Sequence, residues 1–328
     1  MKEAKYYTVR AEKVLCCLCP HFCRLQNHQT GICGVRRAVE GKLYTLNYGI
    51  CGAMALDPIE KKPLYHFYPG SKVFSLGTIG CNLDCDFCQN WQLVRAQSSA
   101  GSITPEKLLE IIFAEIKEPF GIAYTYSEPG MWFEFVLETA KLAQKHGLKN
   151  ILVTNGFLNQ QPLQDLLAVI DAFNIDVKAF SDEFYRQVCA GRLQPVLQYV
   201  KTAAARRHVE LTYLVVPGFN DSEEEIERFA TWVAELNPYI PVHLTRYYPQ
   251  HRFTAAPTPV ATMERLYRVA KEKLAHVYLG NLGGHKAVNT FCPHCQYLLI
   301  KRDGYGVEKR IRGNQCPQCK QVVNLIND

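Results

Sequence analysis

Cysteines are the side chains in this sequence with the clearest capacity for chemistry, because most of them fall into three groups. The chain has 328 residues and 14 cysteines. Eleven cysteines make up the groups, which are Cys16, Cys19, Cys23 and Cys33; Cys81, Cys85 and Cys88; and Cys292, Cys295, Cys316 and Cys319. Short spacings bring thiolates within bonding distance of one metal ion or cluster, whereas chance burial of small apolar residues produces no grouping. The sequence therefore predicts three metal centres.

The central group has three cysteines in a Cys-x3-Cys-x2-Cys arrangement. Three thiolates bind three corners of a 4Fe–4S cubane and leave one iron open, which makes a reactive site rather than a closed electron carrier. Two alternatives stay open, a zinc site and a four-cysteine cluster completed by Cys51 or Cys189. No fourth cysteine lies nearby in the sequence, so we expect the open cluster.

The two terminal groups each offer four thiolates. Two Cys-x2-Cys pairs near the C-terminus, 20 residues apart, are typical of a zinc ribbon, with Tyr297–Ile300 and 309–311 as its expected strands. The N-terminal group has the spacing Cys-x2-Cys-x3-Cys-x9-Cys, and Cys17 is an alternative to Cys16. Four ligands close a site, so this centre is structural or transfers electrons. Zinc and an auxiliary iron–sulfur cluster both fit, with zinc slightly preferred, although the number of thiolates alone does not decide between them.

Between these groups, short apolar runs alternate with helical patterns. Nearly continuous apolar runs are typical of parallel strands covered on both faces. The expected strands are Val73–Thr78, Gly121–Tyr126, Ile151–Thr154, Phe173–Val177, Glu210–Val216, Val242–Tyr247 and Val277–Leu279. Helices are expected after Thr104-Pro105, over Met131–His146, from Ser222 to Leu236 and over Pro259–Ala275. This alternation predicts an α/β fold, a partial (β/α)6 barrel, with an open doubly wound sheet as the alternative.

Polar residues gather where the expected strands end. Cys81 follows the first strand, Ser127-Glu128 the second and Asn155 the third. Asp176 and Lys178 flank the end of the fourth strand, and His243 lies in the sixth. Sites in such folds form at the carboxyl ends of the strands. We therefore expect residues 81–248 to enclose one active site.

The central motif resembles that of the radical S-adenosylmethionine superfamily, in its spacing, in the aromatic Phe87 before the last cysteine and in its place after the first strand. Other stretches resemble the radical enzyme of the AmmeMemoRadiSam system, which is related to pyruvate formate-lyase-activating enzymes. They are Leu18–His21, Asp57–Phe67, Cys88–Trp91, Tyr124–Pro129, Val153–Gly156, Asp176–Lys178 and Val216–Asp221. This resemblance covers almost the whole chain.

The resemblance implies a 4Fe–4S cluster whose open iron binds S-adenosylmethionine, and reductive cleavage of that cofactor to a 5′-deoxyadenosyl radical that abstracts hydrogen. It assigns cofactor contacts to Phe87, Ser127, Glu128, Asn155, Asp176, Lys178 and His243, and it names no catalytic residue. Glu128 corresponds to a glutamate near the cofactor's amino group, although Tyr126 and Ser127 replace the usual glycines. Val153 stands where activases have a cation-binding aspartate, so the cation site is not carried over.

Charge is distributed unevenly along the chain. Residues 1–50 have eight basic against three acidic residues, and residues 286–328 have seven against three, whereas residues 51–285 have 22 against 25. The first residues, MKEAKYYTVR, are polar and basic, and no apolar run approaches the roughly 18 residues that span a bilayer. We therefore expect a cytoplasmic protein in three parts: a Cys-rich segment (1–70), a radical barrel (71–285) and a zinc ribbon (286–328).

Two classes of function fit these features. The first is a radical enzyme acting on a macromolecule, either a protein or an RNA, with a glycyl-radical-enzyme activase as a specific form. The resemblance implies partners of the Amme and Memo types and a low-potential electron donor. The second class is a non-catalytic, metal-dependent nucleic-acid-binding module, which predicts salt-sensitive binding without cofactor turnover. The acidic balance of the middle region argues against the second class.

Overall fold

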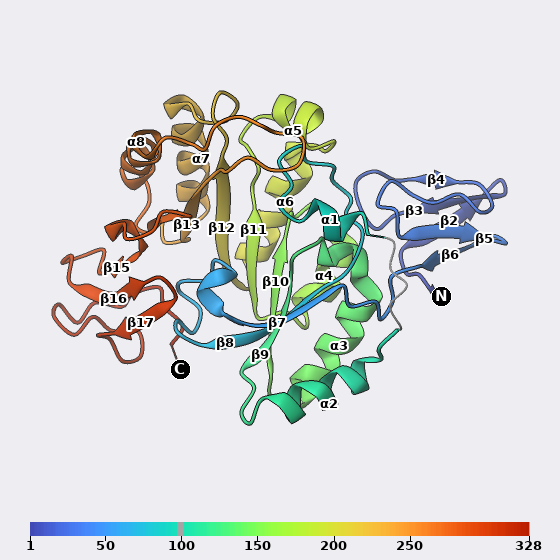
Figure 1. Cartoon of the computed structure of the whole chain (residues 1–328), viewed down its shortest axis with the longest axis horizontal. Coiled ribbons are helices and arrows are strands. Elements are labelled where there is room, and N and C mark those ends of the chain that lie inside the picture. The colour runs from blue at the N-terminus through green and yellow to red at the C-terminus, as the bar shows by residue number, and fades with distance from the viewer. Residues whose placement is uncertain (97–101, 328) are drawn as a thin grey trace.

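The computed structural model describes residues 1–96 and 102–327, and its centre is one large sheet. Eight strands of the described residues lie side by side in the order β14-β13-β12-β11-β10-β9-β8-β7. All neighbours pair in parallel except β7 and β8, which pair antiparallel. The strands follow chain order and the two edges do not pair, so the sheet curves without closing (Figure 1). This arrangement is the predicted α/β partial barrel and excludes the doubly wound alternative, in which the strand order reverses.

The seven expected strands all form, with ends shifted by one or two residues. The sheet consists of β7 (Ala53–Pro58), β8 (Lys72–Gly77), β9 (Gly121–Tyr124), β10 (Lys149–Thr154), β11 (Ala172–Asp176), β12 (His208–Val215), β13 (Val242–Arg246) and β14 (Val277–Gly280). β7 lies within residues 1–70 yet belongs to this sheet, because its residues from Ala53 to Pro58 pair with β8.

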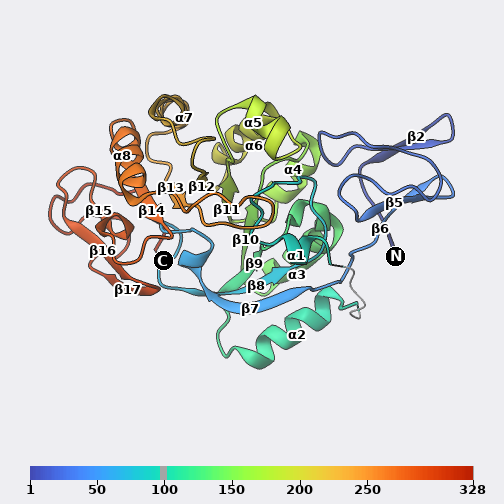
Figure 2. The same ribbon diagram turned by 45° about the horizontal axis from the view of Figure 1, so that its top comes forward.

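Helices surround the outside of the curved sheet (Figure 2). They are α1 (Trp91–Val94), α2 (Pro105–Glu115), α3 (Phe133–Lys145), α4 (Gln160–Leu167), α5 (Asp182–Val188), α6 (Leu193–Ala204), α7 (Glu223–Leu236) and α8 (Val260–Lys271), with short 3-10 turns at Ile59–Lys61, Pro129–Trp132 and Lys286–Val288. The predicted caps form: the Thr104 side chain accepts from the Lys107 amide, and the Ser222 side chain accepts from the Glu225 amide. Among the described residues, none of the helices combines the length and the apolar character that a membrane-spanning helix needs.

The Cys-rich N-terminal segment builds two small antiparallel sheets. One consists of β2 (Tyr7–Arg10), β3 (Lys13–Cys16) and β4 (Arg24–Leu25), and the other of β1 (Lys2–Glu3), β5 (Arg36–Val39) and β6 (Lys42–Thr45). A buried ion pair joins this segment to α3, because Arg36 contacts Glu134 at 2.6 Å with both side chains almost fully buried.

The C-terminal segment forms the predicted ribbon, a third three-stranded sheet of β15 (Thr290–Phe291), β16 (Leu298–Asp303) and β17 (Gly306–Lys309). The expected strand at 309–311 is displaced, since the hairpin partner of β16 ends at Lys309. The ribbon and the N-terminal sheets lie at opposite ends of the large sheet in both views (Figures 1 and 2). The two basic, cysteine-rich segments therefore flank the barrel.

Candidate active site

The loop that carries Cys81, Cys85 and Cys88 leaves β8 at its carboxyl end and is anchored by two other segments. The amides of Asp84 and Asp86 donate to the carbonyls of Cys189 and Val188, each at 3.0 Å. The amide of Arg252 donates to the Asp86 carbonyl at 2.9 Å, and its guanidinium contacts the Asp86 carboxylate at 2.7 Å. This loop is consequently held in place at both its centre and its end.

The three cysteines of this loop lie close enough to influence one another's ionisation. Burial raises the pKa of the Cys81 thiol well above its usual value, and Glu128, Cys85 and Cys88 add to the effect. A hydrogen bond with Cys189 is the main cause of the raised pKa of Cys85, followed by burial. Binding of iron would displace these protons, because only the thiolate is a ligand. The donor set of three converging thiolates fits a cubane cluster with one open corner.

Glu128 connects this loop to the next two strands. Its carboxylate, 3% exposed, accepts from the amides of Gly130 and Asn155, both at 2.8 Å, and from the Thr154 hydroxyl at 2.7 Å. Burial is the main influence on Glu128 and raises its pKa to about 7, although these three donors act in the opposite direction. The glutamate therefore fixes the ends of β9 and β10 against each other beside Cys81.

Asn155 makes direct contact with the cysteine loop. Its side-chain amide donates to Cys81 Sγ at 3.6 Å and to Asn82 Oδ1 at 3.0 Å, while its Oδ1 accepts from the Phe157 amide at 2.8 Å. A donor to a cluster thiolate raises the reduction potential of the cluster. Asn155 is thus placed to adjust the electronic properties of a bound cluster.

Asp176 and Lys178 form an ion pair of 2.7 Å near Cys85, at the carboxyl end of β11. Burial opposes the charge on Lys178, but Asp176 and then Cys85 raise its pKa above the usual value. Lys178 therefore remains protonated next to the cluster loop. It places a positive charge beside Cys85, which would favour an anionic group bound by the cysteine loop.

Ser127 and Phe87 hold the backbone and the loop rather than projecting free groups. The Ser127 hydroxyl accepts from the Thr78 amide at 3.3 Å. Phe87 is 3% exposed and packs between Phe184 and Phe253, with ring centroids 5.9 and 6.1 Å away. The structure thus brings the predicted residues together at this rim, with one exception.

The exception is His243, whose ring contacts another residue deeper in the barrel. His243 pairs with Thr212, which pairs with Asp176, so the three residues form one row on the same face of the sheet. The imidazole nevertheless contacts Glu210 at 2.7 Å and is buried at that position. His243 is therefore a partner of Glu210, and the structure does not bring it to the cysteine loop.

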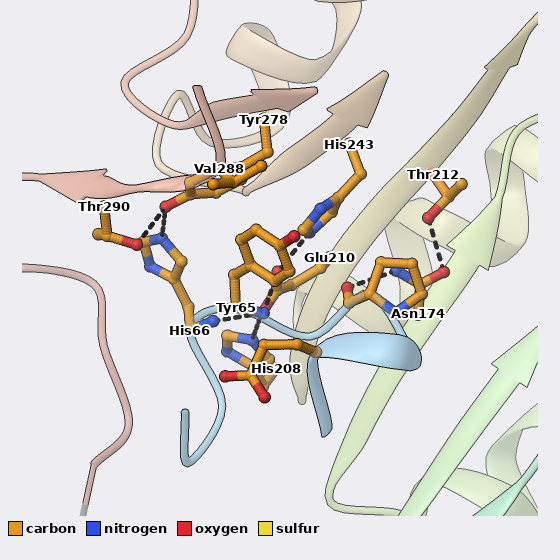
Figure 3. Close-up of polar contacts among 12 residues, drawn as sticks. Tyr65, His66, Asn174, His208, Glu210, Thr212, His243, Tyr278, Val288 and Thr290 are labelled. Atoms are coloured by element: carbon orange, nitrogen blue, oxygen red, sulfur yellow. Dashed lines mark hydrogen bonds and ion pairs between the residues drawn. The ribbon is translucent and has the colours of Figure 1, made fainter. Parts of the chain in front are cut away.

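Glu210 is the hub of a buried polar network that sequence reasoning missed (Figure 3). Its carboxylate accepts from the backbone amides of Tyr65 and His66 at 2.9 and 2.7 Å and contacts the ring nitrogens of His208 and His243 at 3.0 and 2.7 Å. The signal was available: Glu210 is a charged residue inside an apolar strand. This network ties the Asp57–Phe67 stretch to the inside of the barrel.

A second group of interacting side chains, which the sequence did not reveal, joins β7 to the end of β9. Asp57 accepts from Lys62 at 2.7 Å and from the hydroxyl of Tyr126, and the Lys62 ammonium lies 4.6 Å from the centre of the Tyr126 ring. Burial works against ionisation of Asp57, but the hydrogen bonds from Lys61, Lys62 and Tyr126 lower its pKa. Tyr126, which replaces a glycine of the family pattern, is positioned by this contact, and its φ of 67° lies in the left-handed region.

The two terminal cysteine groups differ in how closely their sulfur atoms approach one another. In the ribbon, the sulfurs of Cys292, Cys295, Cys316 and Cys319 all lie within 4.8 Å of one another, the dimension of a single tetrahedral ion. The four N-terminal cysteines instead line a common hollow. Both groups therefore converge, but only the ribbon group is as compact as a zinc site requires among the described residues.

Comparisons with known proteins agree with this geometry. A family model described as the Radical SAM superfamily matches residues 76–230. An uncharacterized protein of Methanocaldococcus jannaschii is 37% identical over 337 residues, which cover 99% of this chain and 100% of that protein. The pyruvate formate-lyase 1-activating enzyme of Escherichia coli is 24% identical over 212 residues, which cover 59% of this chain and 86% of the enzyme.

Solved structures share the fold at low sequence identity. SuiB of Streptococcus suis bound to S-adenosylmethionine superposes with a TM-score of 0.52 at 13% identity, covering 72% of this chain and 56% of that chain. TYW1 with a lysine-pyruvate adduct bound has a TM-score of 0.50 at 18% identity, covering 70% of this chain and 86% of that chain.

Proposed function

We propose, from the premise that this chain belongs to the radical SAM superfamily and is related to pyruvate formate-lyase-activating enzymes, that it abstracts hydrogen from a macromolecular substrate. The cluster and S-adenosylmethionine, when bound, supply a reductively formed 5′-deoxyadenosyl radical for this step. The observation that carries the proposal is the convergence of Cys81 and its two partner cysteines with Asn155 and Glu128 at one rim.

Each side chain at the rim has a separate role in holding the cluster and the cofactor. Cys81, Cys85 and Cys88 hold the cluster, and Asn155 donates to one of the three sulfurs. Lys178 holds a positive charge beside Cys85, because Asp176 keeps it protonated. Glu128 accepts hydrogen bonds from three donors of the chain and so maintains the spacing between the strand ends; by the family resemblance it would also lie near the amino group of a bound cofactor.

A macromolecular substrate is supported by the position of the charged segments. The N-terminal sheets and the ribbon carry the excess of basic residues and lie at opposite ends of the barrel (Figure 1). An acidic protein surface or a nucleic acid that spans the barrel would contact both segments. A small molecule would gain nothing from basic surfaces placed so far apart.

A glycyl-radical-enzyme activase is the more specific alternative, favoured by the similarity to the activating enzyme of Escherichia coli. Val153 argues against its strict form. This residue lies in β10, partly buried and packed against an apolar cluster, where a cation would need an oxygen ligand.

We further propose that the chain works within an AmmeMemoRadiSam system, with Amme- and Memo-type partners and a low-potential electron donor. The support is the set of stretches that runs through the chain, of which Asp57–Phe67 is held by Glu210 inside the barrel. We keep the proposed boundaries at residues 70 and 285, although β7 (Ala53–Pro58), which lies in the first part, pairs with β8 of the barrel sheet.

Anaerobic reconstitution with iron and sulfide, followed by dithionite and S-adenosylmethionine, tests the activity. We expect the wild-type protein to form 5′-deoxyadenosine, measured by chromatography, and Cys85→Ala to form none. Cys51→Ala and Cys189→Ala are matched controls that also test the closed-cluster alternative, since Cys189 lies beside Cys85. Both controls should keep the wild-type iron content and cleavage.

Two results would contradict the proposal. If the wild-type protein showed a complete cluster spectrum but formed no 5′-deoxyadenosine, the proposed radical activity would be wrong. Loss of the cluster in Cys51→Ala or Cys189→Ala would show a fourth thiolate ligand and hence a closed site. For the substrate, deuterium transfer into 5′-deoxyadenosine from a labelled cell extract should follow the protein or RNA fraction, and transfer from the small-molecule fraction alone would overturn the macromolecular assignment.

A further inference from the structure

The four N-terminal cysteines surround a hollow rather than a point. Cys16, Cys19, Cys23 and Cys33 line one small hollow together with Arg36 and Met131. A single zinc ion draws its four thiolates to about 2.3 Å from the metal, and no room remains between them. The N-terminal cysteines do not have this spacing, because among the described residues only the ribbon group has all its sulfurs within 4.8 Å of one another.

The ribbon of the same chain provides an internal standard for a zinc site. Its four sulfurs lie within 4.8 Å of one another, and Cys292 and Cys319 approach to 3.6 Å. In the part of the chain that the structure describes, which includes the whole N-terminal group, no three of the N-terminal sulfurs are as close as this. A cubane spreads its four ligands farther apart, because each thiolate binds a different iron.

The lining of the hollow suits an anionic cluster. Leu18, Leu25 and Met131 make much of the wall apolar and keep water away. Arg36 also lines the hollow and is 1% exposed, and its Nε is buried without a hydrogen-bond partner. The other guanidinium nitrogens are occupied by Glu134 and by the Lys5 carbonyl. A cluster bound in the hollow would supply the acceptor that this donor lacks among the described side chains.

We propose that Cys16, Cys19, Cys23 and Cys33 hold a second, closed 4Fe–4S cluster, to which Arg36 Nε donates a hydrogen bond. The bridging sulfides and thiolates of such a cluster are the acceptors that the orphaned donor lacks. All four irons are bound by protein sulfur, so this cluster has no open corner for S-adenosylmethionine. The proposal does not depend on cofactor cleavage.

This site touches the cysteine loop of the active site. Gly80, directly before Cys81, packs so closely on the N-terminal segment that a Cβ there would lie 2.9 Å from the Cys33 carbonyl oxygen and 2.5 Å from Val35 Cγ1. His21 contacts the Asn82 carbonyl at 2.7 Å through its Nε2. The second cluster would therefore lie next to the first, with few atoms between the two binding loops.

Metal analysis of a Cys81→Ala/Cys85→Ala/Cys88→Ala variant tests the proposal directly. After anaerobic purification from medium that supplies both metals, we expect about four iron and four sulfide per chain from the N-terminal site and about one zinc from the ribbon. Dithionite should produce an electron paramagnetic resonance signal that S-adenosylmethionine leaves unchanged. About two zinc per chain and no iron would overturn the proposal.

The wild-type protein provides a second measurement if the triple variant does not fold. Two clusters require about eight iron and one zinc per chain, whereas a zinc ion at the N-terminal site requires about four iron and two zinc. Arg36→Lys keeps the charge opposite Glu134 but removes Nε. We expect it to retain iron and to lower the midpoint potential of the signal that persists without Cys81, Cys85 and Cys88. An unchanged midpoint potential would show that Arg36 Nε does not donate a hydrogen bond to the cluster.

Discussion

The side-chain amide of Asn155 donates a hydrogen bond to the sulfur of Cys81 at 3.6 Å, across two strand ends that are 74 residues apart in the chain. The same amide donates to Asn82, so its orientation is fixed by two acceptors. A cluster bound by Cys81 would therefore meet a preorganised donor, and its reduction potential would depend on a residue that binds no iron.

Asn155→Ala should lower the midpoint potential of the active-site cluster while leaving its iron content unchanged. The lost hydrogen bond to a charged sulfur corresponds to a decrease of about tenfold in 5′-deoxyadenosine formation with a fixed reductant. Electrochemical titration and chromatography measure the two effects. Gln198→Ala, which truncates an exposed amide on α6, should change neither. A loss of iron in the Asn155 variant would instead indicate a structural role.

Glu128 should make stability fall as the pH rises. Burial raises its pKa in the folded protein to about 7, above the unfolded value near 4.5, so the folded state binds more protons between these values. The resulting stabilisation is complete below about pH 4.5 and is lost as the pH rises through about 7. Glu128→Gln cannot titrate, and should narrow the difference in unfolding temperature between pH 6 and pH 8. An unchanged difference would show that Glu128 is ionised throughout.

Cys316→Ala should remove about one zinc per chain and lower the unfolding temperature, because three thiolates hold the ion less well and the ribbon hairpin loses its centre. Cleavage of S-adenosylmethionine should persist in the folded fraction. Elemental analysis, thermal unfolding and chromatography together test this prediction, with Cys51→Ala as the matched substitution. Loss of cleavage in a fully folded variant would assign the ribbon a part in catalysis.

Glu210→Gln should destabilise the protein by about 3 to 5 kcal/mol, since the buried carboxylate binds two backbone amides and two histidines (Figure 3). Hydrogen exchange in residues 63–67 should accelerate more than exchange elsewhere, because two of the lost partners lie there. Glu227→Gln, whose carboxylate lies at the surface 3.8 Å from Lys273, should cost about 1 kcal/mol or less. Equal effects of the two substitutions would mean that the network contributes no more than an exposed pair.

The sequence predicted the barrel well because its strands are buried on both faces and its helices have strong caps. Apolar runs such as Ile151–Thr154 are typical of strands buried on both faces. Thr104 and Ser222 mark helix starts by the hydrogen bonds that their side chains accept. The cysteine loop and its polar neighbours at Glu128, Asn155 and Asp176 could be located because the carboxyl ends of parallel strands share one edge.

The remaining features depend on contacts that no local pattern encodes. His243 lies in the same row of the sheet as Asp176, yet Glu210 on the neighbouring strand holds it. The sequence could not reveal that Tyr65 and His66 enter the barrel, since their partners are more than a hundred residues away. The N-terminal cysteines predicted a four-thiolate site with zinc slightly preferred, whereas the hollow between them became visible only in three dimensions.

The contacts of His66 impose an order on synthesis and folding. Its backbone amide meets Glu210, while its ring meets Tyr278 and the carbonyl of Asn324, a residue 258 positions later in the chain. The ribosome must synthesise the chain at least as far as Asn324 before this early segment has all its partners. Chains that end early would leave the inside of the barrel open, and pairing over such a distance closes slowly. The segment around His66 thus acquires its full set of contacts only after residue 324 has been made.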